Sequence, residues 1–204
     1  MTTRPPSASA TPRNRAKNER HRALLREAAR LFAARGFDGV SLEDLGTAVG
    51  ITGPAVYRHF ENKRALLGTL LLSAGEELLA GGRRAIDAGG DERGNLRALI
   101  DFHVDFAVAH ADIVRVHDRD LPILADDDRR LVRRLQREYV ELWVGVLQGV
   151  HPAQTDCELR IRAHAGLGLM NATPYTVRAQ PEIGADAPVQ SILSEMAYAA
   201  MAHA

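Results

Sequence analysis

One stretch of the chain, residues 41–62, limits the possible folds more than any other feature of the sequence. Ser41 is followed three residues later by Asp44, which is the spacing of a capping box and predicts that a helix begins there. Apolar residues then recur every three or four positions until Gly50, which can adopt the positive φ of a tight turn. Pro54 suits the first turn of a second short helix. This pattern predicts a helix-turn-helix, whose second helix enters the major groove of DNA.

The second helix and its flanks carry side chains that can contact DNA. Thr52 can cap the helix, while Val56 and Phe60 have the spacing of core residues. From spacing alone, DNA binding and a merely solvent-facing polar surface stay equally open, because such turns also occur in proteins that bind no DNA. Hydroxyl, phenol, guanidinium, imidazole, ammonium and closely approaching backbone groups can reach phosphates or base edges. The candidate DNA-binding residues are Ser41, Thr52, Gly53, Pro54, Ala55, Tyr57, Arg58, His59 and Lys63.

The segment from Gly50 to Leu67, GITGPAVYRHFENKRALL, resembles the recognition helix and the following helix start of the TetR family of bacterial transcription regulators. The resemblance extends from about Ala23. It implies an all-α protein of about nine helices, with three N-terminal DNA-binding helices, a connecting fourth helix and a C-terminal ligand-binding domain. It also implies a homodimer through the last two helices, which a small-molecule effector releases from a palindromic operator in double-stranded DNA. A transcriptional activator remains an alternative.

The resemblance assigns roles to individual residues of the second helix. Tyr57, His59 and Lys63 match positions that contact backbone phosphates in the family. The residues that match positions within reach of bases are Thr52, Gly53, Ala55 and Arg58.

Charge is distributed unevenly along a chain whose net charge is zero. Residues 1–64 hold 12 Lys and Arg against 6 Asp and Glu, so the remaining residues carry the opposite excess. A basic N-terminal part suits a protein that touches nucleic acid at one end. We therefore divide the chain into a disordered basic arm (1–18), a helix-turn-helix domain (19–64) and an effector-binding and dimerisation domain (65–204). The single cysteine and the lack of an apolar signal region favour a cytoplasmic protein with no membrane segment.

Helical periodicity continues to the C-terminus without a strand pattern. Gly81 and Gly82 should weaken the end of the fourth helix, and Pro174 should end the eighth. Small residues on the eighth helix, Ala163 and Gly166, should lie near the crossing of the two subunits. The expected helices are about 20–35, 41–49, 52–60, 62–86, 95–110, 112–117, 126–150, 156–173 and 189–201.

A ligand site is expected between the fifth, seventh and eighth helices. His103 falls on an apolar stripe, and an amide such as Asn171 needs a partner in an interior. Core hydrogen bonds to both groups are an equally good interpretation. An apolar cavity with a few polar groups suits a hydrophobic effector of the acyl-CoA or lipid class. The candidate ligand-binding residues are Phe102, His103, Phe106, Tyr139, Trp143 and Asn171.

The sequence gives less support to two other classes of function, a metal-responsive regulator and an enzyme. His103, His110 and His117 are spaced seven apart, which suggests a metal-responsive regulator, but helical metal pairs are spaced three or four apart. The sequence contains no nucleophile elbow, phosphate loop or paired-acid motif, so we expect no enzyme, no cofactor and no metal.

Overall fold

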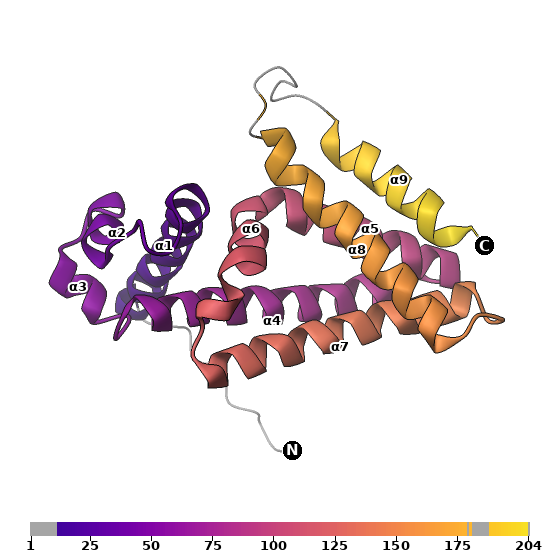
Figure 1. Ribbon diagram of the computed structural model, residues 1–204, viewed down its shortest axis with the longest axis horizontal. Helices are drawn as coiled ribbons and strands as arrows, with labels where there is room; N and C mark the ends of the chain where they lie inside the picture. The colour runs from indigo at the N-terminus through magenta and orange to yellow at the C-terminus, as the bar shows by residue number, and fades with distance from the viewer. Residues whose placement is uncertain (1–11, 179, 181–187, 204) are drawn as a thin grey trace, which may run out of the picture.

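The computed structural model describes residues 12–178, 180 and 188–203, and these residues contain helices and no strand. Figure 1 shows three short or medium helices at one end, joined to a larger helical body by one long helix. The elements are α1 (Pro12–Arg35), α2 (Leu42–Ala48), α3 (Gly53–Tyr57), α4 (Lys63–Gly89), α5 (Glu92–Ala109), α6 (Ala111–Asp120), the 3-10 turn η1 (Leu121–Ile123), α7 (Asp126–Val150), α8 (Asp156–Arg178) and α9 (Val189–Ala202).

The helix-turn-helix forms as the sequence predicts. The Ser41 hydroxyl accepts a hydrogen bond from the backbone N–H of Asp44 at 3.0 Å, and the Asp44 carboxylate accepts one from the backbone N–H of Ser41 at 2.8 Å. These bonds complete a capping box at the start of α2. Gly50 has a φ of +70°, and a Cβ on Gly46 would lie 2.9 Å from the carbonyl oxygen of Ile51. Glycine at both positions therefore lets α3 follow α2 closely.

Two hydrophobic cores share α4. The first core joins α1, α2 and α3 to the first turns of α4 through Leu66, Leu67 and Leu70, and it also includes Val116 of α6. The second core begins at Leu79 and packs α4 against α5, α7, α8 and α9. A single continuous helix is thus buried in both the DNA-binding end and the body of the protein.

Several expected boundaries were wrong. α1 begins at Pro12, so residues 12–18 of the expected disordered arm are helical, since proline is accepted in a first helical turn. The remainder of that arm lies outside the described residues. α6 runs to Asp120 and passes into η1 where a loop was expected, because Arg119 and Asp120 fix this turn against α1.

Two helices also ran past their expected ends, which were about residue 86 for α4 and Pro174 for α8. α4 continues through Gly81 and Gly82 to Gly89, because Phe102 and Leu142 pack where their Cβ atoms would lie. α8 continues past Pro174 to Arg178. Helix-breaking propensities are only a few kcal/mol at most, and tertiary packing can outweigh them.

By length and composition alone, α4 could cross a membrane, since residues Lys63–Ala88 are apolar enough. Half of its most apolar window is buried inside the protein, which is what a core helix also shows. Its burial in both cores accounts for its apolar character.

Candidate nucleic-acid interface and ligand cavity

The end of the molecule formed by α2 and α3 exposes most of the predicted DNA-binding side chains. Tyr57, the last residue of α3, is 52% exposed, and Arg58 is exposed at the C-cap position. Thr52 occupies the N-cap position of α3 but makes no side-chain capping bond, which leaves its hydroxyl to other partners. Gly53, Pro54 and Ala55 form the first turn of α3, with Pro54 exposed. Exposed groups at both ends of this short helix suit contact with a DNA groove.

Two of the predicted DNA-binding residues, His59 and Ser41, also contact other side chains of the DNA-binding domain. His59 is half-buried, with its ring centroid 6.1 Å from that of His21 in α1 and 6.4 Å from that of Phe60. Ser41 is exposed, and its hydroxyl also donates to the Asp44 carboxylate at 2.8 Å. The backbone N–H of Ser41, together with this hydroxyl, lowers the pKa of Asp44. Ser41 thus caps α2, and its contact with DNA stays a prediction.

Lys63 also has partners inside the domain. Its ammonium donates hydrogen bonds to the carbonyl oxygens of Phe37 at 2.7 Å and Val40 at 2.8 Å, and it lies 4.4 Å from the centroid of the Phe37 ring. Two of its three N–H groups therefore hold the segment between α1 and α2. The sequence could not show that those carbonyls lie within reach of Lys63. The contact of Lys63 with a DNA phosphate stays a prediction.

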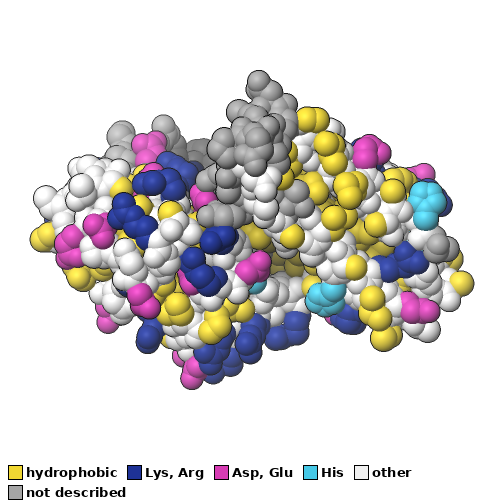
Figure 2. Space-filling view, turned by 45° about the horizontal axis from the view of Figure 1, so that its top comes forward, with side chains coloured by type: hydrophobic (Ala, Val, Ile, Leu, Met, Phe, Trp, Pro, Cys, Tyr) yellow, Lys and Arg dark blue, Asp and Glu magenta, His cyan; other side chains and the backbone are white. Residues whose placement is uncertain are grey.

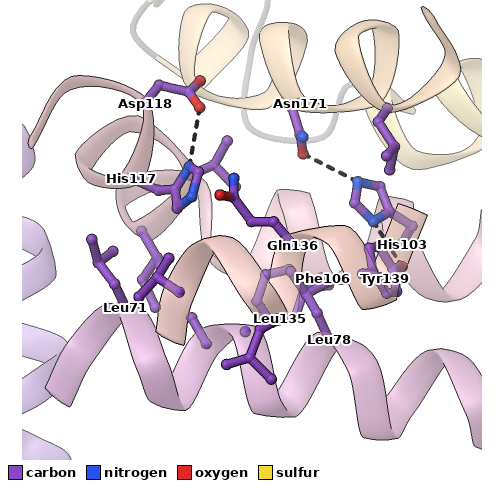
Figure 3. Close-up of a pocket in the computed structure, with 16 residues that line it drawn as sticks. Leu71, Leu78, His103, Phe106, His117, Asp118, Leu135, Gln136, Tyr139 and Asn171 are labelled. Atoms are coloured by element: carbon purple, nitrogen blue, oxygen red, sulfur yellow. Dashed lines mark hydrogen bonds and ion pairs between the residues drawn. The ribbon is translucent and has the colours of Figure 1, made fainter. Parts of the chain in front are cut away.

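A cavity of about 140 Å³ lies between α4, α5, α6, α7 and α8 (Figure 3). Most of its wall is aliphatic or aromatic, and polar groups enter it from α5, α6, α7 and α8. Such a composition is typical of sites for small organic ligands. The lining residues are Leu71, Ala74, Gly75, Leu78, His103, Phe106, Ile113, Val114, His117, Asp118, Val132, Leu135, Gln136, Tyr139, Leu167 and Asn171.

His103 is the centre of a buried hydrogen-bond chain on the cavity wall. It is 2% exposed, and its Nδ1 lies 3.0 Å from the Tyr139 hydroxyl while its Nε2 lies 3.1 Å from Oδ1 of Asn171. Burial lowers the pKa of His103 to about 4 and raises that of Tyr139. The imidazole is therefore neutral at pH 7, with one nitrogen donating and the other accepting. His103 thus lines the cavity and is satisfied by core bonds, and its contact with a ligand stays a prediction.

The structure brings four of the six predicted ligand-binding residues to the cavity and leaves two behind it. His103, Phe106, Tyr139 and Asn171 line it. Phe102 instead packs against Gly81 of α4, and Trp143 is fully buried behind His103, with their ring centroids 5.9 Å apart. Adjacent residues on a helix point about 100° apart, so proximity in sequence did not place Phe102 in the wall.

Sequence reasoning missed the cavity wall supplied by α4 and α6. Leu71 and Leu78 of α4 line the cavity, and nothing in the spacing of the leucines of this helix distinguishes cavity wall from core. His117 was considered only as a metal ligand. Its spacing of three and four residues after the apolar Val114 and Ile113, which line the same cavity, was the available signal that α6 presents a polar group inward.

The three histidines do not converge on a metal. His103 bonds Tyr139 and Asn171, His110 lies 4.0 Å from a carboxylate oxygen of Glu77, and His117 lies beside Asp118. Within the described ranges, no three His, Cys, Asp or Glu side chains are grouped closely enough to hold a metal ion. The metal-responsive alternative is therefore not carried further.

The small residues of α8 also have a different role from the one expected. Ala163 is fully buried, and a Cβ on Gly166 would lie 2.3 Å from Sδ of Met201 in α9, so both face the chain's own interior. The opposite faces of these helices expose apolar side chains, as Figure 2 shows at the upper right. On α8 the exposed stripe is Ile161, Ala165, Gly168 and Ala172, and on α9 it includes Ile192, Met196 and Ala199.

The arrangement of a helix-turn-helix end, a connecting helix and a helical body with a cavity is that of a DNA-binding regulator. Residues 24–70 match the bacterial regulatory proteins of the tetR family, and residues 89–175 match a tetracyclin repressor-like C-terminal domain. The HTH-type transcriptional repressor KstR2 of Rhodococcus jostii is 30% identical over 164 residues, covering 78% of this chain and 79% of that protein. The chain belongs to the TetR family of transcription regulators.

Other relatives and solved structures agree with this assignment. The HTH-type transcriptional activator FasR of Mycolicibacterium smegmatis is 30% identical over 90 residues, or 44% of this chain and 41% of that protein. The ketosteroid transcriptional regulator KstR2 of Mycobacterium tuberculosis shares the fold with a TM-score of 0.73 at 21% identity, over 90% of this chain and 94% of that one. AibR, solved with isovaleryl coenzyme A and operator DNA, has a TM-score of 0.73 at 18% identity, over 90% and 98%.

Proposed function

We propose that this regulator is a homodimeric repressor that a small hydrophobic effector releases from a palindromic operator in the cytoplasm. The observation that carries the proposal is the position of α6 between the cavity and the DNA-binding end. Ile113, Val114 and His117 of α6 line the cavity. Arg119, in the same helix, donates from its guanidinium to the carbonyl oxygen of Phe32 in α1 at 2.6 Å.

A ligand in the cavity can therefore act on α1 through one short helix. The Arg119 guanidinium also pairs with the buried carboxylate of Asp120 at 2.7 Å, which fixes its orientation. An effector must bind more tightly to a conformation whose recognition helices no longer fit the operator, because equal affinity for both conformations would shift nothing. The small cavity and its apolar wall support a hydrophobic effector, of which lipid-like molecules or the acyl part of a thioester are examples.

The exposed apolar stripes of α8 and α9 support the homodimer. Two such stripes, side by side on one face, would form a four-helix interface with the same face of a second copy. Two-fold symmetry in the protein would then require two-fold symmetry in the operator.

Footprinting on the DNA that flanks the protein's own gene tests the proposal, with sedimentation of the protein alone and on the protected DNA. We expect a dimer at micromolar concentration and a protected sequence with an inverted repeat. A monomer that still binds this DNA tightly would refute the proposed assembly. A reporter gene behind the protected site distinguishes repression from activation, which the similarity to FasR keeps as an alternative.

A further inference from the structure

The histidine at the far end of the cavity has a ring nitrogen with no partner in the part of the chain that the structure describes. His117 lies in α6, and its Nδ1 is 3.3 Å from Oδ1 of Asp118. Its Nε2 is buried and has no hydrogen-bond partner among the described residues. Buried polar atoms in proteins are nearly always hydrogen-bonded, so this nitrogen marks a position where a ligand group belongs.

The two polar ends of the cavity differ in what they can offer a ligand (Figure 3). At one end, both ring nitrogens of His103 are already occupied by Tyr139 and Asn171. At the other end, His117 lies beneath Asp118 with Gln136 next to it. In Figure 3, Gln136 lies between the two histidines, and apolar side chains such as Leu135 lie below them. Among the described residues that line the cavity, the buried side-chain atom that lacks a hydrogen-bond partner is therefore Nε2 of His117.

The charge of the wall limits the ligand. None of the described residues that line the cavity is Lys or Arg, and its only acidic residue is Asp118, beside His117. A carboxylate ligand would be buried without a cation and would lie near another carboxylate, which is unfavourable on both counts. An uncharged molecule suits this wall.

We propose that the effector is an uncharged, mainly apolar molecule with a hydroxyl group that donates a hydrogen bond to Nε2 of His117. In a neutral imidazole whose Nδ1–H donates to Asp118, Nε2 carries the lone pair and can only accept. A hydroxyl supplies the required donor, whereas the carbonyl of a ketone, ester or thioester does not. This inference rests on the proposed function, in which the cavity is the effector site, and it narrows the class of effector.

The size of the cavity indicates suitable probes. A protein cavity of about 150 Å³ holds benzene, and this one has a volume of about 140 Å³. Cyclohexanol and cyclohexanone have rings of similar size, and they differ at one oxygen, which donates in the first and only accepts in the second. Their affinities for the full-length protein can be compared by NMR titration, which needs no operator DNA.

We expect cyclohexanol to bind about three to tenfold more tightly than cyclohexanone, the ratio that one net hydrogen bond provides. Cyclohexanol should also shift the Nε2 resonance of His117 in a long-range ¹H–¹⁵N spectrum. His117→Phe should remove the preference while leaving both probes able to bind, and His117→Gln, whose amide oxygen can accept, should keep part of it. The matched control His110→Phe replaces a histidine outside the cavity wall and should leave the preference unchanged.

Several results would overturn the inference. They are equal or stronger binding of cyclohexanone, a preference that survives in His117→Phe, and failure of both probes to bind the wild-type protein. If His117→Phe does not fold, the wild-type titration and His117→Gln still decide the matter. Because the probes are read on the protein alone, their failure leaves operator binding untouched, and failed footprinting would not alter this result.

Discussion

At the scale of single residues, His103 makes stability depend on pH. Its folded pKa of about 4 lies below the ordinary value of 6.5, because burial disfavours the charged ring. Between these pH values the unfolded chain binds a proton that the folded protein does not, so stability falls as pH falls from 6.5 to 4. The total change attributable to this group is at most roughly 3 kcal/mol.

Replacing His103 by Leu should remove this component and also weaken the protein. The Tyr139 hydroxyl and Asn171 amide would lose a buried partner, at a cost of about 1–3 kcal/mol. Urea unfolding from pH 4.5 to 7.5 should therefore show a lower free energy of unfolding at pH 7 and a flatter pH dependence. His164→Leu, at an exposed position of α8, is the control. Parallel pH curves for wild type and His103→Leu would contradict the assignment.

Lys63 should be a stability residue rather than a phosphate contact. Lys63→Met keeps most of the side chain but removes two charge-assisted hydrogen bonds to carbonyl oxygens, so we expect a loss of about 1–3 kcal/mol. The salt dependence of operator binding should stay as in the wild type. The neighbouring Arg64→Met, which is exposed, controls for loss of one charge. If Lys63→Met left stability unchanged and reduced the slope of log affinity against log salt by about one, Lys63 would be a phosphate contact.

The sequence predicted those features of the site that are set within a single helix, and it did not predict contacts between segments. The inward direction of His103 followed from helical periodicity, which fixes the face of a residue within its own helix. The carbonyl partners of Lys63 lie on another segment, and the place of His117 in the cavity wall depends on how α6 packs against its neighbours. No local pattern encodes either. What the sequence missed therefore concerns contacts between elements rather than the character of an element.

At the scale of elements, we predict opposite effects for substitutions at two glycines of α8, one on stability and the other on dimerisation. Gly166 faces Met201 within the chain, whereas a Cβ on Gly168 would meet nothing within 4 Å. Gly166→Leu should lower the melting temperature by disturbing the packing of α8 on α9. Gly168→Leu should leave the melting temperature of the monomer near that of the wild type but shift sedimentation towards monomer. The proposed interface would be contradicted if the Gly168→Leu variant had a lower melting temperature, or if it stayed fully dimeric.

Helix boundaries followed the sequence where the terminal signals agreed. α7 was predicted at residues 126–150 as observed, because three aspartates favour its start and His151 and Pro152 end it. α4 ran to Gly89, beyond its predicted end at about residue 86, and α8 continued past Pro174 to Arg178. The order and number of helices were thus readable from periodicity, and the individual ends less so.

At the scale of the whole molecule, Arg119 should couple the cavity to the operator. Arg119→Lys keeps a charge for Asp120 but cannot reproduce both that bidentate pair and the bond to Phe32. Effector affinity in the absence of DNA should stay within about twofold, while the effector's influence on operator affinity should fall several-fold, or about 1 kcal/mol of coupling. The same replacement at Arg115, one turn earlier, is the control. Unchanged coupling in Arg119→Lys would show that the signal takes another route.

The burial of α4 in both cores limits how such regulators can be recombined. A fusion that joins a foreign sensor at residue 64 would separate the recognition helices from Leu66, Leu67 and Leu70, which complete their interior. A junction beyond Leu71 would transfer those leucines with the helix-turn-helix, but Val116 of α6 would still come from the foreign partner. The sensor and the DNA-binding end therefore exchange as a matched pair of surfaces, and a working chimera needs a donor whose α6 fits the recipient's α1.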